Sequence, residues 1–192
     1  METSEVKRRL AEIENIDDEE LRETVYEIFE EEAPDYLWKV AASSSGKYHP
    51  KDTTGEKGLW IHLKRSYVMY ERLARSYEFQ DKITEEELDY GRAAILLHDI
   101  FKRGFEEKDH TDDYHDIMAA VRLREEYDLP GEVIDCILTH NGPFGSGRRP
   151  QNDLEQVHHL ADMVASERKN YTELEDYPEE LEGIAFRREE EE

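Results

Sequence analysis

The chain has 192 residues, of which 49 are acidic and 25 are basic, giving a formal net charge of −24 at pH 7. This length predicts one domain with a short appendage, and a single cysteine, Cys136, excludes a disulfide framework and a thiolate metal site. No apolar run reaches the ~18 residues that a membrane span needs, and the charged opening from Met1 to Leu10 is unlike a signal peptide, so we expect a cytoplasmic protein with no membrane partner.

Helical periodicity runs through most of the chain, and no segment alternates as a β-strand would. The acidic run 17–20 predicts the start of a helix that continues through Phe29, and Pro34 ends it. A segment rich in turn formers follows over 43–55. The next helix is expected over about 58–77.

The second half of the chain carries clear start and stop signals. Thr84 and Glu87 form a predicted capping box that opens a helix ending at His98-Asp99. Another helix is expected over about 112–127, and Pro130 marks the first turn of the helix after it.

His140 is predicted to end that helix before a glycine-rich loop, and a last helix is expected from Asp153 to about Lys169. The pattern predicts an all-α helical bundle. We divide it into N-terminal helices over 1–42, a main domain over 43–170 and an acidic C-terminal tail over 171–192.

The most informative feature is the pair His98-Asp99, which closes the apolar run 93–97. An imidazole beside a carboxylate at the end of a buried helix suits a divalent transition metal, and such metals activate water. A single pair of this kind is more often a satisfied core histidine. Three further histidines near predicted helix ends, His62, His115 and His140, favour the metal interpretation.

Asp162 adds a carboxylate within the apolar strip 160–165. An unpaired carboxylate there would cost several kcal/mol, so it requires a cation or a hydrogen-bond donor. Helix ends meet in an antiparallel bundle, so all these side chains can converge at one place.

The ordered pattern resembles the HD-domain superfamily of metal-dependent phosphohydrolases over about residues 47–169. The phrases that carry the resemblance are Gly58-Leu59-Trp60-Ile61-His62, Leu97-His98-Asp99-Ile100-Phe101-Lys102, His115-Asp116-Ile117-Met118-Ala119-Ala120, Thr139-His140-Asn141-Gly142 and Ala161-Asp162-Met163-Val164-Ala165-Ser166. The resemblance implies an HD-domain helical bundle.

The resemblance also implies a metal centre with two ions. His62, His98, Asp99 and Asp162 would hold the first metal, and Asp99 would bridge to a second metal held also by His115 and His140. Nitrogen and carboxylate ligands without thiolate suit Mn, Fe, Ni, Co or Zn.

The implied activity is hydrolysis of a phosphomonoester or phosphodiester bond of a nucleotide or another small phosphorylated substrate by metal-activated water. Two alternatives stay open: a nuclease similar to the bacterial 3′-to-5′ exoribonucleases, and a catalytically inactive protein that binds metal or nucleotide. Asp99 and Lys102 are the expected catalytic residues.

Four side chains are candidates for contacting the substrate: Lys102, His49, Arg148 and Arg149. Lys102 lies one turn beyond Asp99 and could place its ammonium on a phosphate, or be a solvated lysine. The arginine pair could receive a phosphate or belong to a plain surface loop. His49 precedes His62 on a loop that resembles the one in the exoribonucleases, and it could equally be an ordinary loop histidine.

The acidic residues are dispersed along the chain rather than gathered in one block. This favours a surface adapted to a salty cytoplasm, where charges are screened within about 3 Å at 1 M salt, over a protein that binds basic partners. In dilute buffer the charge would repel long nucleic acid, so that we expect no such partner except at high salt, where this repulsion loses most of its force. The sequence leaves the oligomeric state open.

Overall fold

A computed structural model describes residues 1–46, 49–145 and 148–167. These residues form α-helices and short 3-10 helices, with no strand among them, which confirms the predicted all-α class. Within the same residues, no helix is long and apolar enough to cross a membrane.

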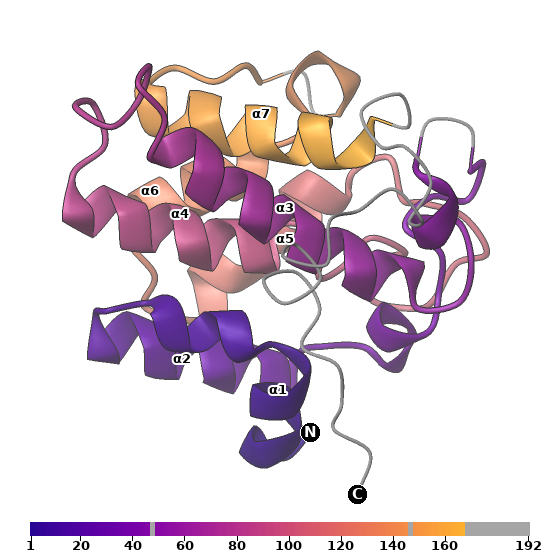
Figure 1. The fold of residues 1–192 in the computed structure, drawn as a ribbon. Helices are drawn as coiled ribbons and strands as arrows, with labels where there is room; N and C mark the ends of the chain where they lie inside the picture. The colour runs from indigo at the N-terminus through magenta and orange to yellow at the C-terminus, as the bar shows by residue number, and fades with distance from the viewer. Residues whose placement is uncertain (47–48, 146–147, 168–192) are drawn as a thin grey trace, which may run out of the picture.

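The N-terminal segment forms four short elements that pack against the side of the main bundle. Figure 1 shows α1 and α2 on one side of α3 and α4, with α7 on the other side. The elements are α1 (Thr3–Arg9), η1 (Ala11–Asn15), α2 (Glu19–Glu31) and η2 (Asp35–Trp38).

The remaining elements build the bundle that carries the predicted ligands. Helix α3 packs against α4 and α7, and α6 packs against α4, α5 and α7. The apolar faces of these helices and of the N-terminal segment join in one hydrophobic core. The elements are η3 (Lys51–Thr53), α3 (Gly58–Ala74), α4 (Glu85–Leu97), α5 (His115–Glu126), α6 (Gly131–Thr139), η4 (Gly142–Phe144) and α7 (Asp153–Ser166).

The predicted capping box at the start of α4 is confirmed. The Glu87 amide donates to the Thr84 hydroxyl at 3.1 Å, and the Thr84 amide donates to the Glu87 carboxylate at 2.9 Å. The two residues thereby satisfy backbone groups that the first turn of a helix leaves free.

Three predicted helix ends differ from the structure. Helix α3 ends at Ala74 rather than Tyr77, because the Ser76 amide bonds to the Leu73 carbonyl in a tighter turn. Pro130 precedes α6 as its cap instead of lying in its first turn. Helix α7 ends at Ser166 rather than at about Lys169, because the backbone of Glu167 is already extended, and the tail 171–192 lies outside the described residues.

Helix α5 begins at His115 and not at Asp112 or Asp113. The Asp112 side chain instead accepts a hydrogen bond from the Tyr114 amide at 3.0 Å, and its carbonyl accepts one from the His115 amide at 3.2 Å. Asp112 therefore forms a turn that ends immediately before the helix, which an aspartate favours through its short acceptor side chain.

Gly91 allows α3 and α4 to approach each other closely. A Cβ atom built on Gly91 would lie 1.9 Å from the hydroxyl oxygen of Tyr70 on α3. That hydroxyl donates to backbone carbonyls of α4, with 3.1 Å to Leu88 O. The missing side chain at Gly91 is therefore what lets Tyr70 reach the α4 backbone.

Candidate metal centre

The structure brings the six predicted ligands together at one end of the bundle. Each is 4% exposed or less, so all six are removed from bulk solvent. They come from five helices or helix ends: His62 lies one turn into α3, His98 and Asp99 follow α4, His115 opens α5, His140 follows α6, and Asp162 lies within α7.

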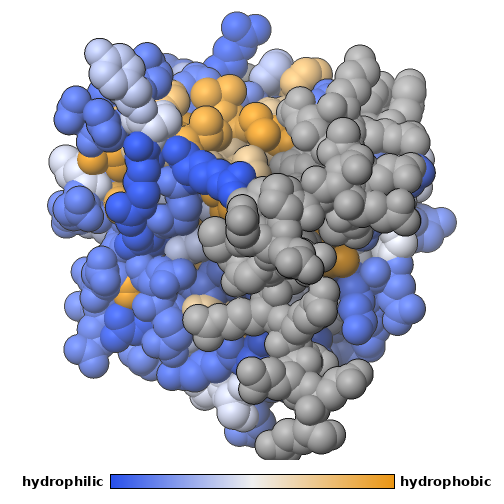
Figure 2. All heavy atoms as spheres, viewed as in Figure 1, coloured by the Kyte–Doolittle hydropathy of each residue, from blue (hydrophilic) through white to orange (hydrophobic). Residues whose placement is uncertain are grey.

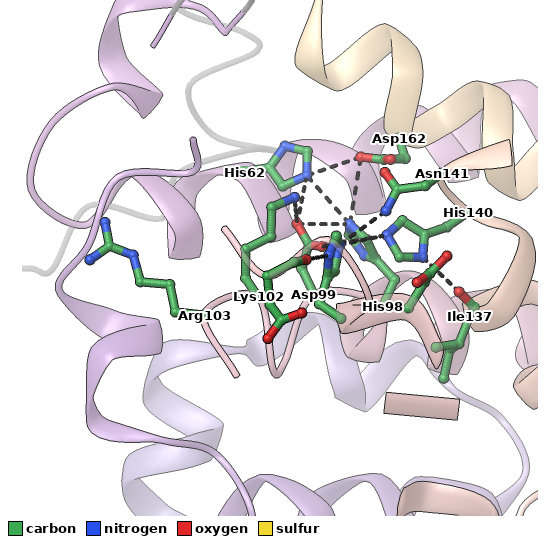
Figure 3. Close-up of polar contacts among 12 residues, drawn as sticks. His62, His98, Asp99, Lys102, Arg103, Ile137, His140, Asn141 and Asp162 are labelled. Carbon is green, nitrogen blue, oxygen red and sulfur yellow. Dashed lines mark hydrogen bonds and ion pairs between the residues drawn. The ribbon is translucent and has the colours of Figure 1, made fainter. Parts of the chain in front are cut away.

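Asp99 is at the middle of the cluster, and its two carboxylate oxygens face different histidines (Figure 3). Oδ2 lies 3.5 Å from His62 Nε2 and 3.4 Å from His98 Nε2. Oδ1 lies 3.1 Å from His115 Nε2 and 3.5 Å from His140 Nε2. One carboxylate thus connects two pairs of imidazoles, as a bridging ligand between two metal ions would.

Asp162 lies beside the first of these pairs, and together they form the first half of the cluster; the second pair forms the second half. Its Oδ1 lies 3.0 Å from His62 Nε2 and 3.5 Å from His98 Nε2. His62, His98 and Asp162 therefore present ligand atoms within 4.8 Å of one another, as do His98, Asp99 and His140.

Backbone carbonyls fix which ring nitrogen of three histidines faces the cluster. The Nδ1 atoms of His98 and His140 lie 2.8 Å and 2.6 Å from carbonyls three residues earlier in the chain, Ile95 O and Ile137 O. The Nδ1 atom of His115 lies 2.6 Å from Asp112 O. A carbonyl can only accept, so each Nδ1 donates, and in the neutral ring Nε2 carries the lone pair.

Most of the atoms that point into the cluster are therefore hydrogen-bond acceptors, and they lie next to other acceptors. His115 Nε2 lies 3.2 Å from His140 Nε2, and His62 Nε2 lies 3.4 Å from His98 Nε2. Asp99 Oδ1 is buried and has no hydrogen-bond partner within the part of the chain that the structure describes. Acceptors packed this way favour a cation among them, and nitrogen with carboxylate oxygen is the donor set that a divalent transition metal takes. The residues present fit such a centre.

The electrostatics of the cluster also favour positive charge. Burial alone would raise the pKa of Asp99, but the Lys102 ammonium and His98 outweigh it and hold this pKa well below its usual range. Burial would lower the pKa of His98, and the charges of Asp99 and hydrogen bonding to Asp162 raise it to about 10. In the absence of metal, a proton on His98 would thus supply part of the missing positive charge.

Lys102 contacts the cluster directly. Its Nζ donates to Asp99 Oδ2 at 2.7 Å, and the side chain is buried with the ligands. The alternative of a solvated lysine at a helix end does not fit this position. Arg103, the next residue, points away from the cluster in Figure 3.

His49 also reaches the cluster. Its ring lies 5.5 Å from that of His62, centroid to centroid, and both ring nitrogens are buried without a hydrogen-bond partner among the described residues. Burial is the largest cause that lowers the pKa of His49, to about 3. His49 is thus a neutral imidazole beside one of the six clustered side chains.

The arginine pair is not brought into the cluster. The Arg148 guanidinium pairs with Asp135 on α6 at 2.9 Å, and the Arg149 carbonyl accepts from Gln151 at 2.6 Å. The intervening glycine-rich loop includes residues 146–147, which lie outside the described residues. A role for Arg148 and Arg149 in binding phosphate stays a prediction.

Sequence reasoning missed Asn141, whose amide nitrogen lies 3.0 Å from His115 Nε2 (Figure 3). Its position directly after His140 was a usable signal. Sequence reasoning also missed the carbonyls of Ile95, Asp112 and Ile137, for which no signal exists, because every residue carries one.

No curated protein and no solved structure matches the chain. The HD domain family, in contrast, matches residues 59–167, more than half of the chain. The matched span begins in the first turn of α3, ends just after α7 and includes all six clustered ligands. The chain therefore belongs to the HD domain family, whose members are in general metal-dependent phosphohydrolases.

Proposed function

We propose that this protein hydrolyses a phosphomonoester or phosphodiester bond of a nucleotide or another small phosphorylated substrate, with two divalent metal ions bound per chain. The observation that carries the proposal is the position of Asp99, whose two oxygens face separate pairs of histidine Nε2 atoms. Asp162 adds an oxygen on one side only, which makes the two halves chemically distinct.

In this proposal His62, His98, Asp99 and Asp162 hold the first metal, and Asp99, His115 and His140 hold the second. Mn, Fe, Ni, Co and Zn suit these nitrogen and oxygen ligands. Such ions, when bound, lower the pKa of water and neutralise charge that develops on phosphoryl oxygens.

Lys102 and His49 are the side chains that we assign to the substrate. The Lys102 ammonium is held at Asp99 Oδ2, so a phosphoryl group placed at the first half of the centre comes within its reach. His49 lies on the segment before α3, and its ring nitrogens have no partner in the described part of the chain, so its N–H is available to a substrate. A cation and a neutral donor on one phosphoryl group orient it and stabilise its charge.

The second candidate function is a nuclease, and the position of His49 favours it. A buried imidazole with both nitrogens free beside the cluster can contact a sugar or a phosphate outside the scissile bond. Hydrolysis of short single-stranded RNA from one end, with mononucleotides left intact, would establish the nuclease in place of the nucleotide hydrolase.

The proposal is tested by hydrolysis of bis-p-nitrophenyl phosphate with added Mn²⁺. Asp99→Asn keeps the shape of the bridging ligand and removes its charge, and we expect at least about a hundredfold loss of kcat, since even residues that only orient ligands are worth ten- to a hundredfold. The matched control is Asp113→Asn, an exposed aspartate near α5, which should leave kcat unchanged.

Activity that survives Asp99→Asn would show that the hydrolytic site is elsewhere. Tight Mn²⁺ binding without hydrolysis of this compound, of nucleotides or of short RNA would favour the inactive metal-binding alternative.

A further inference from the structure

The hydroxyl of Tyr36 connects the N-terminal segment to the loop that follows the His98-Asp99 pair. Tyr36 lies on η2 and is 2% exposed. Its hydroxyl donates to Gly104 O at 2.8 Å and accepts from the Arg103 amide at 3.1 Å. One side chain thus satisfies a donor and an acceptor on consecutive residues of a loop.

This loop, residues 99–114, holds both halves of the metal centre. At its start, Lys102 places its ammonium on Asp99 Oδ2. At its end, Asp112 O accepts from His115 Nδ1 at 2.6 Å and fixes the ring of a second-metal ligand. The Asp112 amide donates to Lys102 O at 2.8 Å, so the two ends of the loop are joined directly.

Gly104 shows that the loop conformation is specific. Its φ of +82° lies in the region that favours glycine, and a Cβ atom there would lie 3.3 Å from Glu106 O and 3.4 Å from Asp112 Oδ2. Gly104, whose carbonyl accepts the Tyr36 hydrogen bond, is therefore also the residue at which the loop turns.

The segment after Tyr36 also holds the chain before α3. The Lys57 amide donates to Lys39 O at 3.0 Å, and the Leu59 amide donates to Val40 O at 2.9 Å. The segment 36–42 therefore contacts both the start of α3 and the 99–114 loop. It lies outside the span that matches the HD domain family.

We propose that Tyr36 is a positioning residue of the metal centre. Its hydroxyl fixes the 99–114 loop, and through it the Lys102 ammonium at the first half and the His115 ring at the second half. The N-terminal segment thus positions residues of the centre in addition to packing against the hydrophobic core. The consequences for kcat and for binding of a second Mn²⁺ rest on the proposed function, whereas the consequence for loop motion does not.

The test is Tyr36→Phe, which removes one oxygen and keeps the packed ring. The matched control is Tyr26→Phe: Tyr26 is a buried tyrosine of α2 whose hydroxyl donates to Glu14 at 2.8 Å, in the same N-terminal segment. Three quantities are measured for the full chain: hydrogen–deuterium exchange of each peptide, Mn²⁺ affinity by calorimetry, and kcat with bis-p-nitrophenyl phosphate.

For Tyr36→Phe we expect faster exchange confined to residues 99–115, about tenfold weaker binding of the second Mn²⁺ and a kcat lowered about tenfold. The control should leave exchange in 99–115 and Mn²⁺ affinity unchanged. Gly104→Ala perturbs the backbone of the same loop directly and should reproduce the pattern of Tyr36→Phe.

Exchange in 99–115 that is unchanged in Tyr36→Phe would overturn the inference, and so would faster exchange spread evenly over the whole chain, because that is the result of a general loss of stability. If the wild-type protein binds Mn²⁺ and hydrolyses nothing, the proposed function fails while the exchange result still decides the role of Tyr36.

Discussion

At the scale of single residues, the centre is built from side chains that the sequence identifies and backbone atoms that it does not. The order of histidines and aspartates predicted that these six side chains lie together, because a buried carboxylate such as Asp162 requires a cation or a donor and helix ends meet in an antiparallel bundle. The choice between Nδ1 and Nε2 could not be predicted, since it depends on carbonyls such as Asp112 O at 2.6 Å from His115. Arg148 could not be placed either, because its partner Asp135 is one of many acids in the chain.

His115 provides the residue-scale prediction. It contacts only the Oδ1 side of Asp99 among the carboxylates of the cluster described here, so His115→Ala should remove a ligand of the second metal and leave the first half intact. Mass spectrometry of protein purified without chelator should find close to two metal ions in the wild type and close to one in the variant. His110→Ala is the control, because that side chain is 64% exposed on the neighbouring loop. Equal metal content in wild type and His115→Ala would contradict the two-metal assignment.

At the scale of elements, a helix boundary that local side chains determine was predicted more accurately than one that the backbone determines. The capping box of Thr84 and Glu87 is local, so four residues of sequence determine it. The end of α3 at Ala74 depends on a backbone turn that several sequences could form. The contact between α3 and α4 was not predictable from either helix alone. It depends on the Tyr70 side chain of α3 occupying the space that Gly91 of α4 leaves open.

Gly91→Ala tests this contact. Alanine is better than glycine in a helix by about 1 kcal/mol, but here its methyl group would overlap the Tyr70 ring, and overpacking costs about 1–3 kcal/mol. We expect a net loss of unfolding free energy, measured by urea denaturation. Gly131→Ala, at the open start of α6 with no atom within 4 Å of the new methyl, should be neutral or stabilising. Equal effects of the two substitutions would show that α3 and α4 are less closely packed than described.

At the scale of the whole molecule, the net charge of −24 is carried by many separate helices. Exposed acids occur at the start of α2, at the start of α4 and at the end of α5, including Asp17, Glu85 and Glu125. Figure 2 shows a mostly hydrophilic face, with apolar residues gathered near its top and a few others elsewhere on it. Adaptation to a salty cytoplasm stays a prediction, and it concerns the sum of these charges rather than any one of them.

The salt dependence of unfolding tests that prediction. Repulsion among dispersed acids weakens the folded state, and salt at 1 M screens it beyond about 3 Å. The unfolding temperature should therefore be higher in multimolar KCl than in dilute buffer, measured with the metal content held constant. Greater stability in dilute buffer would rule out adaptation to salt.

Metal binding should also stabilise the folded chain. The six ligands span residues 62–162, so a bound ion connects segments that the unfolded chain cannot hold together. A ligand that binds only the folded state adds about 2.7 kcal/mol to its stability at a free concentration about a hundred times its Kd. Addition of EDTA should lower the unfolding temperature of the wild type and have little effect on a His62→Ala, His115→Ala double variant. An unchanged wild-type transition would contradict the shared centre.

In the proposed two-metal centre, the convergence of helix ends on Asp99 would make the ions cross-links of the fold in addition to their part in hydrolysis. A chain that lacks them would expose the ends of α4, α5 and α6 to proteases more often, because the open population rises as stability falls. Metal supply would then determine how long each copy of the protein survives in the cell, in addition to how fast it works.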